Sequence, residues 1–393
     1  MTTPEPTTSA GWVAAEALHT SGVYPKRPLA LVRGAGARVW DADGREYIDC
    51  VAGQGAANLG HAHPAVAAAI AGQAARLISC PEIFANDQRA AYAAELVAQL
   101  PAGLRRVFFC NSGAETVEGA LKFARAITGR RGVVATVRGF HGRTFGALSA
   151  TFEPKYREPF MPLVPGVVHV PYDRIAALEA AVDDGTAAVI VEPIQGEGGV
   201  RVPADDYLAA VADCCRRRGA LLIVDEVQTG FGRTGALFAS AAAGVTPDML
   251  LLAKSIAGGL PMGAIAVHER FGTMAPASHG TTFGGGPVVC AAARATLQAL
   301  VTAGLPERAA RLGAALLARL RAQALPRVRE VRGRGLLIGL ELKERVQPVL
   351  VALLERGVLA LPAGPNVLRL LPPLVIAEDD LWHVADVLGE LLG

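Results

Sequence analysis

Short apolar segments alternate with amphipathic segments through the middle of the chain. Six apolar runs bounded by turn residues have the length and composition of strands buried on both faces. They lie at 107–110, 133–137, 167–170, 187–192, 221–224 and 249–253. Segments with helical periodicity lie between them, at 116–128, 175–182 and 205–218. Strands that alternate with helices predict an α/β fold, with a mostly parallel central sheet and helices on both of its faces.

The two ends of the chain differ from this middle part. Near the N-terminus, alternating apolar and polar residues around Asp43-Gly44 predict a β-hairpin over 39–50, and the segment 12–21 predicts a short helix. After residue 286, alanine- and leucine-rich helices surround short apolar strands, which is typical of a smaller α+β domain. We therefore predict an N-terminal segment (1–48) packed with the small domain, a large domain (49–286) and a small C-terminal domain (287–393).

Composition narrows the class of protein. The chain has 393 residues, 51% of them hydrophobic, and a net charge of +2, which indicates a globular protein with no nucleic-acid partner. No apolar run approaches the ~20 residues that span a membrane. The six cysteines form no CxxC pair, which disfavours a disulfide or zinc framework and favours a cytoplasmic location. His61 and His63 could bind a metal, but Pro64 favours a helix entry instead, and no metal is predicted.

Charged side chains stand at the ends of two predicted buried strands. Asp225 and Glu226 follow one apolar run, and Lys254, one of only five lysines in the chain, follows another. Charged groups are rarely buried without a partner, so each of these side chains needs something to bind. Ligands of parallel α/β sheets bind beyond the carboxyl ends of the strands. We expect these residues to meet in one crevice with Glu192 and the segment 111–113.

Lys254 has two interpretations at such a position. A lysine desolvated at a strand end has a lowered pKa and suits covalent amine chemistry with a carbonyl compound. The alternative is a salt bridge to Asp225 or Glu226. Lys122 is a weaker candidate for the amine, because it follows Glu118 by four residues on a predicted helix and should form an ion pair there. Asp225 is the matching acid, since a buried carboxylate beside a pyridine nitrogen favours the pyridinium form.

Three glycine-containing turns are candidates for phosphate or nucleotide binding. NSGAE (111–115) joins a strand to a helix, where free N–H groups can bind an anion; the alternative is an ordinary N-cap by Ser112. HGTTFGGGP (279–287) could add hydroxyl groups to the same phosphate. GFGRTG (230–235) matches GxGxxG, but no helix opens at its glycines and no strand-ending acid follows at the required distance. A dinucleotide site is therefore not predicted.

Several motifs, in the same order, resemble those of the class III pyridoxal-phosphate-dependent aminotransferases, which have fold type I. The family's cofactor segment is similar to IVDEVQTGFGRTG followed by PDMLLLAKSIAGGLPMGA, and the likeness covers nearly the whole chain. Further matching segments are NSGAETVEGALKFARAITGR, RGFHGRTFGALSAT, AAVIVEPIQGEGGV, HGTTFGGGP and VLRLLPPLVI. Within the class, the chain most resembles acetylornithine aminotransferases and their relatives in lysine biosynthesis, which use an amino-group carrier protein instead of an acetyl group.

The resemblance implies a site for pyridoxal 5′-phosphate. Lys254 would hold the cofactor covalently and then move a proton between the substrate carbon and the cofactor, while Asp225 would pair with the ring nitrogen. Gln228 would donate to the phenolic oxygen of the ring, and Phe140 would stack on the ring. The phosphate would be bound by Ser112, Gly113 and Ala114 of one subunit and by the partner subunit's Thr282 in a homodimer.

The resemblance also implies how the substrates bind. Arg143 would bind a substrate carboxylate, with Thr281 close by, and Tyr24 would line the entrance. Glu197 and Arg369 match a pair in which the arginine binds the α-carboxylate of glutamate or 2-oxoglutarate and the acid masks it for the other substrate. A planar guanidinium suits a carboxylate, because it can donate two parallel hydrogen bonds to it.

Two residues depart from the family's pattern. Ala114 replaces a threonine that many relatives have, and Gln54 stands where relatives commonly have Ile or Tyr facing the substrate. The expected reaction moves the terminal amino group of an N-acylated ornithine, or of a lysine linked to a small acidic carrier protein, to or from 2-oxoglutarate and glutamate in arginine or lysine biosynthesis. The alternatives are an ornithine or 4-aminobutyrate aminotransferase, a mutase or decarboxylase with the same cofactor, and a regulatory protein without catalysis. The two carboxylate-binding arginines, Arg143 and Arg369, argue against the last.

Overall fold

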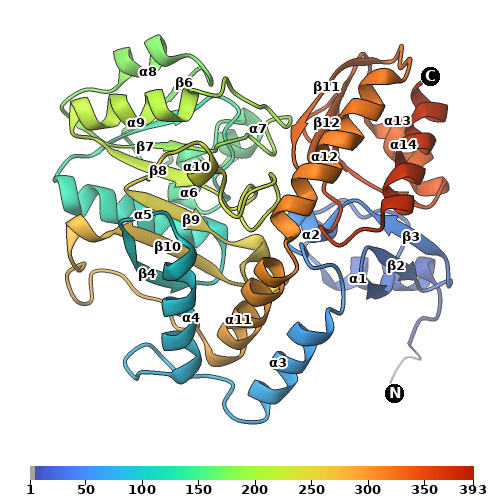
Figure 1. The fold of residues 1–393 in the computed structure, drawn as a ribbon, viewed down its shortest axis with the longest axis horizontal. Helices are drawn as coiled ribbons and strands as arrows, with labels where there is room; N and C mark the ends of the chain where they lie inside the picture. The colour runs from blue at the N-terminus through green and yellow to red at the C-terminus, as the bar shows by residue number, and fades with distance from the viewer. Residues whose placement is uncertain (1–4) are drawn as a thin grey trace.

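A seven-stranded sheet forms the centre of the larger part of the molecule (Figure 1). The structure is a computed structural model that describes residues 5–393. The strand order is β4-β10-β9-β8-β7-β5-β6, and the pairs from β9 to β6 are parallel. The strands are β4 (Leu104–Cys110), β5 (Gly132–Thr136), β6 (Val167–Val170), β7 (Thr186–Val191), β8 (Leu221–Asp225), β9 (Met249–Leu252) and β10 (Gly263–His268). Six of them were predicted, and the mostly parallel sheet is confirmed.

Strand β10 is the one that the sequence pattern missed. It lies between β4 and β9 and runs antiparallel to both. Its sequence, GAIAVH, has an apolar run of strand length, but it follows the glycines after Lys254 closely, and no strand was predicted there. Because β4 is antiparallel to β10, it is parallel to β9, and its carboxyl end lies at the same edge of the sheet as the others.

Helices cover both faces of this sheet. Alternate residues along each strand point to opposite faces. Ile190 and Ile223 belong to a core shared with α5 (Gly113–Thr128) and α6 (Phe145–Ala150). Val189, Leu222 and their equivalents belong to a second core shared with α8 (Ile175–Ala181) and α9 (Tyr207–Arg218). Full burial of one such side chain stabilises the fold by about 1.5–3 kcal/mol, so the apolar strand runs account for the layered arrangement.

Two four-stranded sheets form the rest of the molecule. The C-terminal sheet has the antiparallel order β11-β12-β15-β14, and the N-terminal sheet has the order β1-β2-β3-β13. In the N-terminal sheet, strand β13 comes from the C-terminal part of the chain and pairs with β3 in parallel. These strands are β1 (Leu31–Ala35), β2 (Arg38–Asp41), β3 (Glu46–Asp49), β11 (Val328–Arg334), β12 (Leu337–Leu342), β13 (Val358–Leu359), β14 (Leu361–Pro362) and β15 (Val367–Leu370). The hairpin around Asp43-Gly44 is confirmed, with Gly44 at a positive φ of 85°.

The remaining helices pack around these sheets. They are α1 (Ser9–His19), α3 (Pro64–Ala74), α4 (Asp87–Gln99), α11 (Pro287–Thr302), α12 (Leu305–Ala322), α13 (Gln347–Glu355) and α14 (Glu378–Leu392). Helix α1 begins three residues before the predicted segment, where the Thr8 side chain accepts a hydrogen bond from Gly11 N–H. Helix α11 packs against α3 and α4 as well as α12. The division of the chain at residues 48 and 286 stays a prediction.

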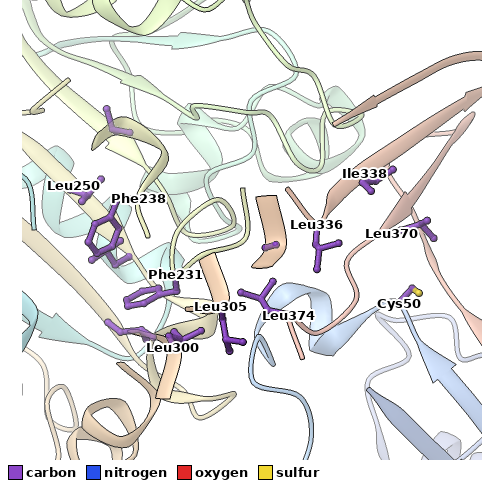
Figure 2. Packing of buried hydrophobic residues seen from close by; sticks show 14 of the residues in the cluster. Cys50, Phe231, Phe238, Leu250, Leu300, Leu305, Leu336, Ile338, Leu370 and Leu374 are labelled. Carbon is purple, nitrogen blue, oxygen red and sulfur yellow. The ribbon is translucent and has the colours of Figure 1, made fainter. Parts of the chain in front are cut away.

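The glycine motif GFGRTG joins the two large parts of the molecule. Phe231 lies in a continuous apolar cluster that runs from Leu250 on β9 to Ile338 on β12 (Figure 2). Arg233 is fully buried and donates to the carbonyl oxygen of Leu336 at 3.0 Å, and also to the Pro372 carbonyl and the Asn58 side chain. A packing role thus accounts for this motif.

One predicted side-chain contact is wrong. Lys122 does not pair with Glu118. Its ammonium donates to the Ser278 carbonyl at 3.1 Å and lies 2.9 Å from His279 Nδ1, while Glu118 Oε1 accepts from Thr144 Oγ1 and Gly146 N–H. The tertiary contacts of α5 override the i,i+4 pairing, because each partner finds a fixed donor or acceptor elsewhere.

No single helix within residues 5–393 is long and apolar enough to cross a membrane. Helices α11 and α12 reach that length and composition only as a pair, which is bent by 59°.

Candidate active site

The predicted strand-end residues meet at one edge of the central sheet. Asn111, Glu192 and Asp225 end β4, β7 and β8 or follow them directly, and Lys254 lies two residues after β9. Lys254 opens the short 3₁₀ helix η2 (Lys254–Ala257). Asp225, Glu192 and Glu197, the last in the loop after β7, all lie close enough to Lys254 to influence its pKa. The expected convergence of Glu192, Asp225 and Lys254 is therefore present.

Asp225 is held in a buried network. Its side chain is buried, its Oδ1 accepts from Val227 N–H at 3.0 Å, and its Oδ2 lies 2.7 Å from His141 Nδ1. Glu192 is close by, and its Oε1 accepts from Phe140 N–H at 3.2 Å. The polar atoms of His141, Glu192 and Asp225 lie within 4.8 Å of one another. Desolvation, and then the neighbouring charge of Asp225, raise the pKa of Glu192 well above its usual value. That the site needs no metal stays a prediction.

Lys254 forms neither of the salt bridges that were considered. The Asp225 carboxylate is engaged by His141 and Val227, and the Glu226 carboxylate accepts from Ala239 N–H, from the Ser240 backbone and side chain, and from Thr229. Burial, as the largest effect, lowers the pKa of Lys254. A larger fraction of neutral amine is therefore present than for an exposed lysine, as a nucleophile requires.

The backbone around Lys254 is strained. Lys254 has a φ of +42°, in the left-handed region that side chains other than glycine rarely adopt. The neighbouring segment α2 (Ala52–Gly55) contains Ala52 and Gln54 at positive φ angles of 46° and 62°. The Ser255 hydroxyl donates to the Gly55 carbonyl oxygen at 2.7 Å and so connects the two segments. Backbone strain of this kind costs about 1–3 kcal/mol per residue and persists where the surroundings hold it.

The start of α5 combines an N-cap with free donors. The Ser112 side chain accepts from Glu115 N–H at 3.2 Å, which is the N-cap considered above. Within residues 5–393, the N–H groups of Gly113 and Ala114 have no acceptor. Gly142 packs closely on this turn, because a Cβ on it would lie 2.8 Å from the Ala114 Cβ. Two open N–H groups at the positive end of a 16-residue helix can bind an anion.

Glu197 and Arg369 form an ion pair beside these groups. Arg369 Nη1 lies 2.7 Å from Glu197 Oε1 and donates to Gln228 Oε1 at 3.1 Å. The arginine is only 2% exposed, and β15 holds it in register with Gly339 of β12. Burial raises the pKa of Glu197, but the charges of Arg369 and Lys254 outweigh it, and the net pKa is lowered. The glutamate therefore balances a buried guanidinium at neutral pH.

Two aromatic side chains, Phe140 and Tyr156, lie next to Arg143. The half-buried ring of Phe140 meets Tyr156 edge to face, with the ring centres 6.2 Å apart. Arg143 is exposed, and its guanidinium carbon lies 3.5 Å from the centre of the Tyr156 ring and 5.5 Å from that of Phe140. Tyr156 belongs to α7 (Pro154–Arg157) and had no predicted role. A cation on two aromatic faces remains available to a carboxylate.

Three other predicted residues have no contact that defines their role. Thr281 accepts from Asn111 Nδ2 at 3.0 Å, Thr282 is exposed, and Tyr24 is 68% exposed. Their assigned roles stay predictions. Conversely, His141 and Tyr156 contact predicted site residues but were not singled out. His141 stands next to Phe140 in the matched segment FHGR, so adjacency was the one signal available.

The residues of the crevice fit a flat aromatic group with an aldehyde, a basic ring nitrogen and a phosphate. The free N–H groups of α5 can bind the phosphate, and the ring of Phe140 can stack on the aromatic ring. The buried Asp225 can pair with a protonated ring nitrogen, and the Lys254 amine can react with the aldehyde. Together with the seven-stranded sheet, this set of groups has the arrangement expected of a fold type I transferase that uses pyridoxal phosphate.

The comparisons with known proteins agree. The chain belongs to the family Aminotransferase class-III, which matches residues 21–392, and it is an aminotransferase. It is 50% identical over 385 residues to the [LysW]-aminoadipate semialdehyde transaminase of Deinococcus radiodurans, covering 97% of this chain and 90% of the relative. It is also 50% identical over 372 residues to the acetylornithine aminotransferase of Methanopyrus kandleri, covering 94% and 95% of the two chains.

A solved structure has the same fold. The ornithine aminotransferase of Toxoplasma gondii is 36% identical and superposes with a TM-score of 0.94, covering 98% of this chain and 95% of that one.

Proposed function

We propose that this aminotransferase moves the terminal amino group of an N-acylated ornithine or a carrier-linked lysine to or from 2-oxoglutarate and glutamate. The observation that carries the proposal is the ion pair between Glu197 and the buried Arg369, next to Lys254. An enzyme with two different amino-group partners must accept an α-carboxylate in one half-reaction and none in the other. Arg369 can bind the α-carboxylate in one half-reaction, and Glu197 can neutralise the arginine in the other.

The cofactor is held by the chain's own residues from several sides. Pyridoxal phosphate, when bound, supplies an aldehyde that a primary amine can attack and a ring that withdraws electrons. Gly113 and Ala114 N–H, with Ser112, hold the phosphate, and Phe140 covers the ring. Asp225 holds the proton on the ring nitrogen. The Lys254 amine, with its lowered pKa, is the base that moves the proton from the substrate carbon.

The substrates are divided between two arginines. Arg369 binds the α-carboxylate of glutamate or 2-oxoglutarate when Glu197 turns away, and Arg143 binds the distal carboxylate, with Gln228 holding the phenolic oxygen of the ring. The exposure of Arg143 suits a substrate that reaches in from solvent. Gln54 and Tyr24 are both exposed, and we propose that they face the N-acyl or carrier end of the substrate. The names of the two relatives above support an acylated or a carrier-linked substrate equally.

The enzyme is proposed to work as a homodimer in the cytoplasm. Ile83, Phe84 and Phe283 are 83%, 62% and 69% exposed, although large apolar side chains normally cluster inside. Arg89 donates to the carbonyl oxygens of Phe84 and Gly285 and so holds these two segments together. A second copy placed here covers the apolar side chains and brings the partner subunit's Thr282 to the phosphate. The six free cysteines suit a reducing compartment.

Replacement of Lys254 tests the proposal. The Lys254→Ala variant should lose turnover by several orders of magnitude and no longer be fixed to the cofactor by borohydride, whereas Lys343→Ala, at an exposed lysine of the small domain, should behave as wild type. Rates with N-acetylornithine, ornithine and carrier-linked lysine, each with 2-oxoglutarate, identify the donor. Turnover that does not need 2-oxoglutarate and forms no glutamate would instead favour the mutase or decarboxylase alternative.

A further inference from the structure

The loop that carries Glu197 is closed at its base and strained at its tip. At the base, Gln195 N–H donates to the Arg201 carbonyl oxygen at 3.1 Å, and Arg201 N–H donates to that of Gln195 at 3.0 Å. At the tip, Gly199 and Val200 have positive φ angles of 109° and 49°. A β-branched residue rarely adopts this region, and such a conformation persists only where the surroundings hold it. Contacts from elsewhere in the molecule must therefore hold the tip of the loop.

Arg332 on β11 binds this tip. Its Nε donates to the carbonyl oxygens of Gly199 and Val200 at 3.1 and 2.9 Å, and its Nη2 donates to that of Gly199 at 2.6 Å. Its Nη1 donates to the carboxylates of Glu330 and Glu341 at 2.6 and 2.7 Å. The side chain is 7% exposed, so every nitrogen of a buried guanidinium is engaged. An arginine suits this position, because its planar fork donates in several fixed directions at once.

The C-terminal sheet places Arg332 in register with Arg369. Gly339 of β12 is paired with Arg332 of β11 on one side and with Arg369 of β15 on the other. Residues directly opposite one another in antiparallel strands point to the same face, so both arginines lie on the face that the loop contacts. Gly339 leaves room between them, because a Cβ on it would lie 2.8 Å from the Val200 Cβ. The loop therefore packs between one arginine that binds its backbone and one that pairs with Glu197.

We propose that Arg332 is a positioning residue for the choice between the two substrates. By fixing the backbone at the tip of the loop, it keeps Glu197 within reach of Arg369 while no α-carboxylate is bound. The inference rests on the proposed function, in which Glu197 neutralises Arg369 in one half-reaction and releases it in the other. An arginine with a purely structural role would affect stability and both half-reactions alike, whereas a positioning residue changes the balance between them.

Replacement of Arg332 tests this role. Arg332→Met removes the donors to the tip of the loop, so Glu197 should compete less well with a substrate carboxylate at Arg369. The ratio of kcat/KM for 2-oxoglutarate to kcat/KM for the amino donor should rise by about 3- to 10-fold, the usual effect of one hydrogen bond. Arg329→Met is the matched control, because the exposed Arg329 is on the same strand and pairs with Glu341 at 3.3 Å. This control should keep the wild-type ratio, and a wild-type ratio in Arg332→Met would overturn the inference.

Two further variants serve if Arg332→Met does not fold. Arg332→Lys keeps a positive charge beside Glu341, but one nitrogen replaces three and cannot also bind both carbonyl oxygens of the loop. Gly339→Ala keeps every charge and instead displaces Val200 from the sheet, because the added Cβ would lie 2.8 Å from the Val200 Cβ. Both variants should shift the ratio in the same direction as Arg332→Met. A wild-type ratio in both would show that the packing of the loop on the sheet does not position Glu197.

A double-mutant cycle shows whether Arg332 acts through Glu197. In the Glu197→Gln background the carboxylate that the loop positions is absent, so Arg332→Met should change the ratio by less than about twofold. A full additional change there would mean that the arginine acts in another way, and the inference would be wrong. If Glu197→Gln alone keeps the wild-type ratio, the proposed masking of Arg369 is refuted and the inference with it. If Glu197→Gln shifts the ratio and Arg332→Met does not, only the inference is refuted.

Amide hydrogen exchange of the cofactor-free protein gives a measurement that does not depend on turnover. The N–H groups of Gln195 and Arg201 close the base of the loop, and their exchange reports how often the loop opens. Exchange at both should be about 3- to 10-fold faster in Arg332→Met than in Arg329→Met, because the loop has lost the donors at its tip. Equal exchange in the two variants would show that Arg332 does not hold the loop and would overturn the inference.

Discussion

The Glu197–Arg369 pair allows a quantitative prediction about substrate exchange. In the Glu197→Gln variant, the carboxylate that neutralises Arg369 becomes a neutral amide of the same shape. Arg369 then keeps its hydrogen bond to Gln228 but loses its only ion pair within residues 5–393. A carboxylate ligand no longer has to replace Glu197. We expect 2-oxoglutarate to bind more tightly and the amino donor to react more slowly, because an uncompensated guanidinium then faces the incoming amine.

The size of the effect follows from the geometry. Two unit charges about 4 Å apart attract by about 4 kcal/mol at an effective dielectric constant of ~20. The Glu197 side chain is 31% exposed, so solvent screening reduces the net contribution to about 1–3 kcal/mol. This energy corresponds to a roughly 5- to 150-fold change in affinity. The ligand-free variant should lose a similar 1–3 kcal/mol of stability, since it keeps the buried charge without its partner.

Single-turnover absorbance measurements separate the two half-reactions. The KM for 2-oxoglutarate should fall by roughly 5- to 150-fold, and the KM for the amino donor should rise. Glu344→Gln is the matched control, because Glu344 pairs with Arg327 on the surface of the small domain at 2.6 Å, and its loss should change neither constant. If the KM for 2-oxoglutarate is unchanged or rises in Glu197→Gln, Glu197 does not mask Arg369, and the reasoning from this ion pair is refuted.

Three other substitutions probe buried polar groups. Arg233→Met leaves three buried acceptors without a donor. Part of this loss is offset, because the substitution also removes a desolvated charge, whose burial lowers the pKa of the arginine to about 9. We expect the free energy of unfolding in urea to fall by about 2–4 kcal/mol, and an unchanged midpoint would contradict this. Tyr92→Phe removes a buried hydroxyl that has no partner within residues 5–393, so it should be neutral or stabilise by up to ~1 kcal/mol, and a clear loss would reveal an unrecognised acceptor. The Lys254 pKa is lowered by folding, so the cost of its buried charge is complete below the folded pKa and disappears as pH rises towards 10.5. Lys254→Met should therefore stabilise the cofactor-free protein at pH 7 and do so less near pH 10, and a pH-independent difference in stability would argue against desolvation.

Local patterns were enough to predict the architecture and the chemistry at the strand ends. The apolar runs identified six of the seven strands of the central sheet, because a strand buried on both faces has to be apolar throughout. For the same reason, Asp225 and Lys254 were conspicuous, since a charge at the end of such a run demands a partner. A candidate anion site at the start of α5 could also be predicted, because the Ser-Gly turn and the free N–H groups after it are neighbours in the chain.

Other features depend on which distant segments meet. His141 and Asp225 are 84 residues apart, and Arg233 and Leu336 are 103 apart, so no local pattern contains either contact. Lys122 contacts His279 instead of the residue expected on its own helix. The GFGRTG segment packs between two parts of the molecule, where Arg233 donates hydrogen bonds to residues far away in the sequence. The antiparallel insertion of β10 is likewise a matter of pairing.

The sequence by itself therefore determined the layers of the fold and the residue types at the edge of the sheet, because periodicity and strand-end charges are properties of consecutive residues. Only the tertiary structure decided which buried polar groups meet, which charge is neutralised by which partner and where the backbone is strained. Those outcomes depend on distances of a few ångströms between residues that the chain itself keeps far apart.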